Sequence, residues 1–151
     1  MTWVEDGIFA AGGDHIPQTW QEFSTQTGIR AVVHLAHTGP ARFEGCLERF
    51  LWLKSEREAE ADVATRELAA EFVRSCRESG LAILLHCSSG RHRTRWIYVA
   101  YRLRMGASLR SVLRAAAEKP WMGPYHTDNG LWEAFCAQLQ TRAKEATPDN
   151  K

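Results

Sequence analysis

The chain has 151 residues, of which 44% are hydrophobic and 25% are charged, and its formal net charge is +1. These fractions are typical of a soluble globular domain, so they exclude wholesale disorder and a fibrous repeat. The length suits one domain, which we expect over residues 1–145, followed by a flexible polar tail at 146–151. The near-neutral charge favours neither a nucleic-acid partner nor an anionic membrane surface.

No hydrophobic run reaches the roughly 18–20 residues that a membrane helix needs, and the first residues do not resemble a secretory signal. The cysteines form no C-x-x-C pair and have no zinc-ligand spacing; they are Cys46, Cys76, Cys87 and Cys136. We therefore expect reduced thiols in a cytoplasmic protein. We also expect a monomer that uses no metal and no other cofactor.

Strands and one short helix are predicted in the first part of the chain. Apolar runs bounded by turn residues predict three strands, at residues 4–10, 31–35 and 50–53. Between the first two, Thr19 and Glu22 form a capping-box pattern for a helix that ends at Gly28.

A long helix and the central strand are predicted next. Asp62 is a natural N-cap, and Gly80 ends the helix. Between them apolar residues recur at mostly helical spacing: Val63, Leu68, Ala69, Phe72, Val73 and Cys76. The apolar run at 81–85 predicts a strand buried on both faces. Three further helices are predicted, at 96–105, at 109–118 with Ser108 as its cap, and at 131–143. This pattern predicts an α/β fold with a mostly parallel central sheet flanked by helices.

The segment between the buried strand and the next helix carries the chemistry. It reads His86-Cys87-Ser88-Ser89-Gly90-Arg91-His92-Arg93-Thr94. Backbone N–H groups of a tight loop at a helix N-terminus point inward, and the helix dipole adds positive potential, so residues 88–93 predict a phosphate-binding cradle. Gly90 permits the close turn, and Arg93 presents a planar fork to two phosphate oxygens. Thr94 can cap the helix and hydrogen-bond a neighbouring sulfur.

Cys87 stands at the mouth of this cradle. A free thiol has a pKa near 8.5, which falls to roughly 3.5–7.5 at helix N-termini beside Arg or His. The positive field that holds a phosphate dianion would therefore hold Cys87 as a thiolate. That thiolate can attack phosphorus and form a phosphocysteine, which water then hydrolyses. The loop amides and Arg93 match the charge of the transition state, and no metal is required.

The pattern His86-Cys87-x-x-Gly90-x-x-Arg93-Thr94 resembles the signature loop of the cysteine-dependent protein tyrosine phosphatases, H-C-x-x-G-x-x-R-[S/T]. The short chain resembles their compact dual-specificity branch, and other stretches are similar to it: residues 8–13, Trp20, 28–35 and 124–132. Most of residues 4–140 is covered, although only the signature loop is sharply specific. The resemblance implies a protein tyrosine phosphatase-like fold of the dual-specificity type.

For two supporting residues and two loop side chains, the sequence indicates a role less specifically than it does for Cys87 and Arg93. His86 precedes the loop, so we expect it to be a buried hydrogen-bonding support that orients the cysteine. Asn129, or Asp128 beside it, is expected to brace the phosphate loop. The family's side chains point outward at the positions of Arg91 and His92, where they touch either substrate or solvent.

The family's general acid is an aspartate on the loop before the long helix, and this chain departs from that pattern. The early part of the loop, residues 54–62, contains no Asp. Glu56 is nearest the expected place and could transfer the proton with a longer reach; Glu58 is the second choice. Asp62 has the right residue type, but a helix N-cap explains it better. An active site without an acid from this loop also stays open.

The leading hypothesis is a metal-independent phosphomonoester hydrolase that acts through a phosphocysteine. Its substrate is either a phosphoprotein, as the resemblance implies, or a small organic phosphate such as a nucleotide or a sugar phosphate. The alternative is a pseudophosphatase-like module that recognises phosphate with little turnover, which the missing aspartate motivates. Sulfur or arsenate chemistry on a similar loop is a third class, against which His86 and Thr94 favour the phosphatase. The expected partner is the phosphorylated molecule.

Overall fold

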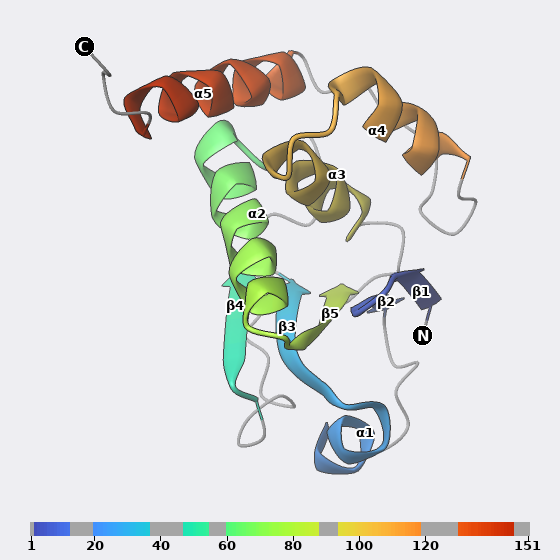
Figure 1. Cartoon of the computed structure of the whole chain (residues 1–151). Helices are drawn as coiled ribbons and strands as arrows, with labels where there is room; N and C mark the ends of the chain where they lie inside the picture. Colours follow the sequence, from blue (N-terminus) through green and yellow to red (C-terminus); the bar gives the residue numbers. More distant parts are fainter. Residues whose placement is uncertain are drawn as a thin grey trace.

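The computed structural model describes residues 2–12, 20–36, 47–54, 60–87, 94–118 and 130–146. In these residues five strands form one sheet (Figure 1) in the order β1-β2-β5-β3-β4. Their bounds are Thr2–Glu5 for β1, Ile8–Gly12 for β2, Ile29–Leu35 for β3, Arg49–Leu53 for β4 and Ala82–Cys87 for β5. Strands β2, β5, β3 and β4 are parallel neighbours, while β1 pairs antiparallel with β2. The predicted mostly parallel sheet is confirmed, and β1 makes it a mixed sheet.

Helices cover both faces of the sheet, but unequally. The short helix α1, Trp20–Thr27, packs Phe23 against Val32 and Leu84 on one face. The other face carries the main core, to which α2 (Val63–Glu78), α3 (Arg95–Arg104), α4 (Leu109–Ala117) and α5 (Leu131–Ala146) contribute. Figure 1 shows these four helices together, with α1 apart from them. The predicted α/β architecture is therefore confirmed.

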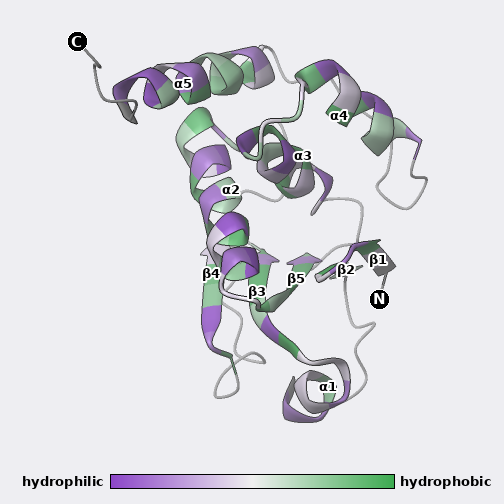
Figure 2. Cartoon of the chain, viewed as in Figure 1, coloured by the Kyte–Doolittle hydropathy of each residue, from purple (hydrophilic) through white to green (hydrophobic). Residues whose placement is uncertain are grey.

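The hydrophobic pattern explains the layers. Figure 2 shows hydrophobic residues along β3 and β5, whereas hydrophobic and hydrophilic residues alternate along α2. Strand β5 has β2 on one side and β3 on the other, and its residues from Ile83 to Cys87 are all buried. A strand in this position loses water on both faces, which is why its sequence is a continuous apolar run.

Helix termini follow the local signals in the sequence. The Asp62 carboxylate accepts a hydrogen bond from the Thr65 amide at 2.8 Å, and the Ser108 hydroxyl accepts one from the Ser111 amide at 3.3 Å. Both residues are N-caps, as predicted. Helix α5 runs to Ala146, three residues beyond its predicted end. Thr19, the predicted cap of α1, lies outside the described residues.

Two expectations about the first strand and the core face of α2 are wrong. The predicted strand at residues 4–10 is a hairpin of β1 and β2, because Gly7 adopts φ +82° and turns the chain between them. Leu68 was expected on the buried face of α2, but its exposed fraction is 52%. The buried positions of α2 are Arg66, Ala69, Ala70, Val73 and Cys76. Their spacing of three or four residues leaves Leu68 on another side of the helix.

None of the helices within the described ranges combines the length and the hydrophobicity needed to cross a membrane.

Candidate active site

The candidate site lies where the four parallel strands end. The register pairs Cys87 with Gly12 on one side and with Leu35 on the other, and Leu35 pairs with Leu53. These four residues, one from each strand, form a row at the carboxyl edge of the sheet. Helices lie on both faces of the sheet on either side of β5. In open α/β sheets, ligands bind beyond the carboxyl ends of the strands, at the place where the connecting helices change from one face to the other.

Cys87 is the last residue of β5 and is completely buried. Its neighbours at alternate positions, Ile83 and Leu85, belong with it to the main core on the side of α2 and α3. Helix α3 begins at Arg95, so seven residues, 88–94, separate the end of the central strand from the start of a buried helix. A strand before residues 88–93 and a helix after them agree with the sequence-based prediction for the surroundings of the cradle.

Thr94 is buried, with an exposed fraction of 3%, directly before α3. Its side chain makes no capping hydrogen bond, so the prediction that it caps the helix is wrong. The physical reason is its backbone, since φ −84° and ψ −6° are helical rather than the extended angles of an N-cap. Its predicted hydrogen bond to the sulfur stays a prediction.

The other predicted residues of the loop and of its surroundings lie outside the described part of the chain. They are Glu56, Glu58, Ser88, Ser89, Gly90, Arg91, His92, Arg93 and Asn129. Their roles stay predictions.

His86 has the buried environment that was expected of it, with an exposed fraction of 2%. Nothing in the sequence analysis indicated its partner. His34 of β3 is opposite His86 in the register, and their Nδ1 atoms are 2.9 Å apart. His34 is also buried, with an exposed fraction of 5%. The only signal that could have found this pair is the similar place of both histidines near the end of an apolar strand.

Arg66 is a second residue that sequence reasoning missed. It is fully buried in α2, and its Nε donates to the Ala61 carbonyl at 2.8 Å. Its guanidinium carbon lies 4.0 Å from the ring centroid of Trp132 in α5. The arginine thus connects the chain just before α2 with the start of α5. An arginine three residues after Val63, on the apolar face of a helix, is the signal that could have revealed it.

The other cysteines of the described ranges have surroundings unlike an activated thiol. Burial raises the pKa of the Cys76 thiol in α2 and of the half-buried Cys136 thiol in α5. No disulfide joins Cys76, Cys87 and Cys136, and their reduced state stays a prediction. Cys46 lies outside the described residues.

Asp62 is the one candidate acid that the structure describes. The hydrogen bonds from Thr65 lower the pKa of its carboxyl group, because they stabilise the charged form. A carboxyl group held ionised caps a helix well but is a poor proton donor at neutral pH. The interpretation of Asp62 as an N-cap is thereby confirmed.

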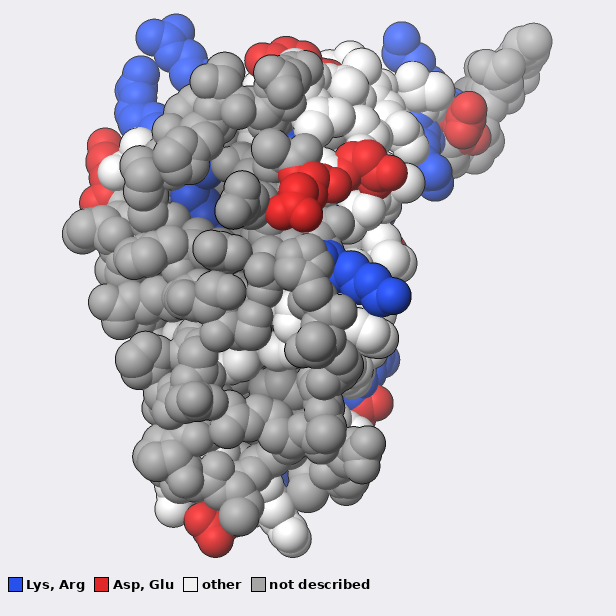
Figure 3. All heavy atoms as spheres, turned by 180° about the vertical axis from the view of Figure 1, so that it is seen from behind, with Lys and Arg blue, Asp and Glu red and all other residues white. Residues whose placement is uncertain are grey.

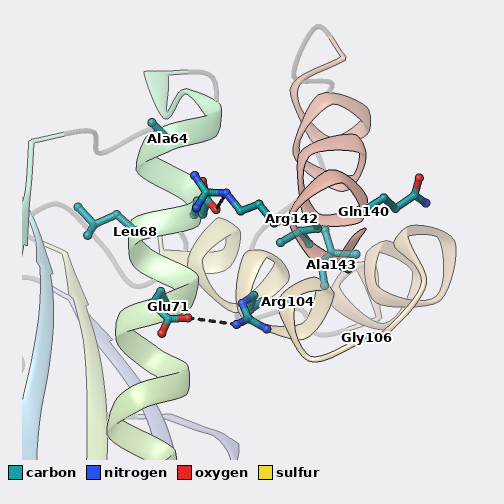
Figure 4. A pocket seen from close by; sticks show the side chains of 11 residues that line it. Ala64, Leu68, Glu71, Arg104, Gly106, Gln140, Arg142 and Ala143 are labelled. Carbon is teal, nitrogen blue, oxygen red and sulfur yellow. Dashed lines mark ion pairs between the residues drawn. The ribbon is translucent and has the colours of Figure 1, made fainter. Parts of the chain in front are cut away.

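A groove of about 900 Å³ lies between α2, α3 and α5 (Figure 4). Leu68, Leu103 and Leu139 line it, and two ion pairs, Glu71–Arg104 and Glu67–Arg142, lie at its sides. Arg104 is at the far end of α3 from Thr94, about 15 Å along the helix axis. This groove is therefore separate from the Cys87 site.

Charges of both signs are interspersed on the described part of the face seen in Figure 3. The described residues on this face therefore form no patch of one sign, in agreement with the net charge of +1.

No family model matches the chain, and no curated protein matches it by sequence. Solved structures do match. Human DUSP28 superposes with a TM-score of 0.68 at 17% identity, over 97% of this chain and 100% of its own. A mouse putative dual specificity phosphatase gives 0.69 at 20% identity, over 98% and 92%. DUSP15 gives 0.68 at 17% identity, over 99% and 98%.

The fold is that of the dual-specificity phosphatases. The match covers nearly the whole of this chain and nearly the whole of each of these three structures, so it describes the complete arrangement of sheet and helices rather than a shared motif. The sequence-based expectation of a protein tyrosine phosphatase-like fold of the dual-specificity type is confirmed. At these identities the likeness concerns the fold, and the chemistry has to be argued from the residues.

Proposed function

We propose that the chain is a metal-independent phosphomonoester hydrolase with Cys87 as its nucleophile. The observation that carries the proposal is the position of Cys87, at the end of the central strand and eight residues before Arg95, the buried first residue of α3. The intervening residues match the phosphatase signature, in a chain with the dual-specificity phosphatase fold. The mouse protein of that fold is complexed with zinc tungstate, and tungstate is a tetrahedral oxyanion as phosphate is.

In the first proposed step the Cys87 thiolate attacks the phosphorus of a monoester. A bond between sulfur and phosphorus forms while the bond from phosphorus to the ester oxygen breaks. The leaving oxygen takes a proton from a general acid, for which Glu56 is our first candidate and Glu58 the second. The loop amides of residues 88–93 and the Arg93 guanidinium hold the three other phosphoryl oxygens.

In the second step a water molecule attacks the phosphocysteine. The new bond from oxygen to phosphorus forms while the bond to sulfur breaks, which releases phosphate and restores the thiolate. The carboxylate that lost its proton in the first step accepts one from the water. Both steps therefore balance without a metal ion or any other co-reactant.

The complete burial of Cys87 sets a condition on this chemistry. A buried thiolate without partners is unstable, because the charge has lost its hydration. The proposal therefore requires the loop amides and Arg93 to replace that hydration with fixed positive potential. The same burial keeps bulk water away from the sulfur.

The substrate is a phosphoprotein or a small organic phosphate. The absence of an Asp early in loop 54–62 gives some weight to the small molecule, because a substrate with a good leaving group needs less help from an acid. We further propose that the protein acts as a cytoplasmic monomer. The wide spacing of the cysteines, without a C-x-x-C pair, supports the location.

The test is phosphate release from an aryl phosphate in the presence of a chelator. We expect turnover by the unaltered protein, a loss of at least about 1,000-fold for Cys87→Ser, and a loss of about 100- to 1,000-fold for Arg93→Ala. Cys136→Ser is the matched control, because it removes a thiol outside the site and is expected to keep the turnover. Equal rates for the unaltered protein and Cys87→Ser would refute the proposal.

A phosphate-recognition module is the second candidate. The departure from the family's aspartate and the burial of the nucleophile favour it. In that case vanadate or phosphate would bind tightly, Arg93→Ala would abolish the binding, and no aryl phosphate would be hydrolysed. Titration calorimetry with vanadate, beside the turnover assay, separates the two functions.

A further inference from the structure

The paired histidines behind the nucleophile have no role in the proposed reaction steps. His34 and His86 are 52 residues apart in the sequence and come together because β5 inserts beside β3. Both rings are buried. On the same face of these two strands, the pair His34 and His86 comes next after the apolar pair Val32 and Leu84. A polar pair at the end of an apolar column needs internal hydrogen bonds, because water does not reach it.

The two rings meet edge to edge. Their planes are inclined by only 24°, and their centroids are 5.0 Å apart while the Nδ1 atoms are 2.9 Å apart. The centroid separation exceeds the nitrogen separation by roughly the two ring radii, as it does when a hydrogen bond lies near the plane of both rings. The Phe50 ring of β4, with its centroid 6.5 Å from that of His34, flanks the pair.

This contact couples the tautomers of the two rings. One Nδ1 must carry the proton and the other must present its lone pair. In the neutral pair the two Nε2 atoms then have opposite roles, one as a donor and the other as an acceptor. His34 therefore decides, together with His86, which atoms of the His86 ring donate and which accept.

The position of His86 makes this coupling relevant to the nucleophile. Successive residues of a strand point to opposite faces, so the His86 ring lies on the α1 face with Leu84, and Cys87 lies on the main-core face with Leu85. The ring thus acts on Cys87 through the backbone of the strand end. A ring held by His34 fixes the peptide that begins the phosphate loop.

We infer that His34 is a positioning residue of the site: its Nδ1 contact holds the His86 ring in one orientation and tautomer, and so holds the end of β5 that presents Cys87. The inference rests on the proposed phosphatase function. A reacting atom displaced by about 1 Å costs on the order of 100-fold in rate. Loss of the contact is therefore expected to lower kcat by roughly 10- to 100-fold. KM should change little, because the loop amides and Arg93 bind the phosphate.

Three substitutions of His34 test the contact itself. The amide nitrogen of asparagine occupies nearly the place of Nδ1, whereas the longer glutamine side chain places its amide near Nε2. We expect His34→Asn to keep most of the kcat of aryl phosphate hydrolysis, and His34→Gln and His34→Leu to lose it. Equal kcat for His34→Asn and His34→Gln would overturn the inference, and this comparison holds even if His34→Leu does not fold.

Val32→Ala is the matched control. Val32 is fully buried in β3, two residues before His34 on the same face. Its truncation weakens packing without touching the imidazole pair, so we expect lower stability and an unchanged kcat for the folded protein. A loss of kcat in Val32→Ala as large as that in His34→Gln would show that general loosening of β3 explains the effect, and would overturn the inference.

A spectroscopic measurement completes the test. Long-range proton–nitrogen correlation spectra of the imidazoles should show one protonated and one bare Nδ1 in the pair, with the His86 signals changed far more by His34→Gln than by Val32→Ala. An unchanged His86 spectrum in His34→Gln would contradict the coupling. If the unaltered protein hydrolyses the aryl phosphate and His34→Gln does so equally well, only the positioning inference fails. If the unaltered protein shows no hydrolysis, the proposed function itself has failed.

Discussion

Replacing Gly7 by alanine tests the turn that divides β1 from β2. Gly7 has φ +82°, a left-handed conformation that costs an alanine about 1–2 kcal/mol. An added Cβ would also lie 2.1 Å from Cζ of Arg77 and 2.3 Å from each of its two terminal nitrogens. Such distances lie far inside van der Waals contact, so the guanidinium must move away.

The displaced guanidinium loses a defined interaction. Nη1 of Arg77 donates to the Leu81 carbonyl at 2.8 Å, which joins the end of α2 to the residue before β5. Hydrogen bonds of charged groups contribute about 1.5–3 kcal/mol, and the half-buried position of Arg77 favours the lower part of this range. Together the strained turn and the lost bond predict that Gly7→Ala lowers the free energy of unfolding by about 2–4 kcal/mol.

Urea unfolding, followed by circular dichroism, measures the loss. Gly28→Ala is the matched control, because Gly28 has φ +76° and its added Cβ would meet no heavy atom within 4 Å. It should lose only the cost of the left-handed conformation, about 1–2 kcal/mol. In an Arg77→Ala background, the loss caused by Gly7→Ala should fall to the Gly28→Ala value. Equal losses for Gly7→Ala and Gly28→Ala in the unaltered background would refute the reasoning.

Two further predictions concern Asp62 and Cys76. Asp62→Ala removes the cap of α2 and should lower the free energy of unfolding by about 1 kcal/mol, whereas Asp62→Asn should keep most of the cap. Because the pKa of Asp62 is lowered in the folded state from its ordinary value of 3.8, its carboxylate stabilises the fold above that pH, and the contribution is lost as the pH falls through the folded-state pKa. Acid unfolding of Asp62→Asn should lack this loss, and an acid transition identical to that of the unaltered protein would contradict the assignment. Burial raises the pKa of the Cys76 thiol, so iodoacetamide at neutral pH should label the more exposed Cys136 before Cys76; mass spectrometry that finds Cys76 labelled first would disprove this order.

Local signals explain why much of the fold was predictable. The Asp62 and Ser108 caps depend on residues only three positions away, and the strand at 81–85 is recognisable because both of its faces are covered. The predicted nucleophile belongs to this class as well. Cys87 was located by residues within seven positions of it, and the structure places it at the end of the central strand, as the sequence required.

The misses at Leu68 and Arg66 depend on contacts between distant parts of the chain. Leu68 is apolar, but its side of α2 lines a groove shared with α3 and α5 rather than the core. Arg66 is charged, yet it is buried because the Ala61 carbonyl accepts from its Nε and the Trp132 ring lies against its guanidinium. In both cases the hydropathy of the residue predicts the wrong environment, because the neighbouring element determines whether the side chain is buried.

His34 shows most clearly what the order of the strands adds. Along the chain, β3 follows β2, and nothing local indicates that β5 inserts between them. That insertion makes His34 and His86 register partners and brings their Nδ1 atoms within hydrogen-bond distance. A short signature can therefore predict a nucleophile and its oxyanion cradle, because both predictions come from one continuous segment. The group that we propose to position this segment comes from another strand, and it can be recognised only once the sheet has been assembled.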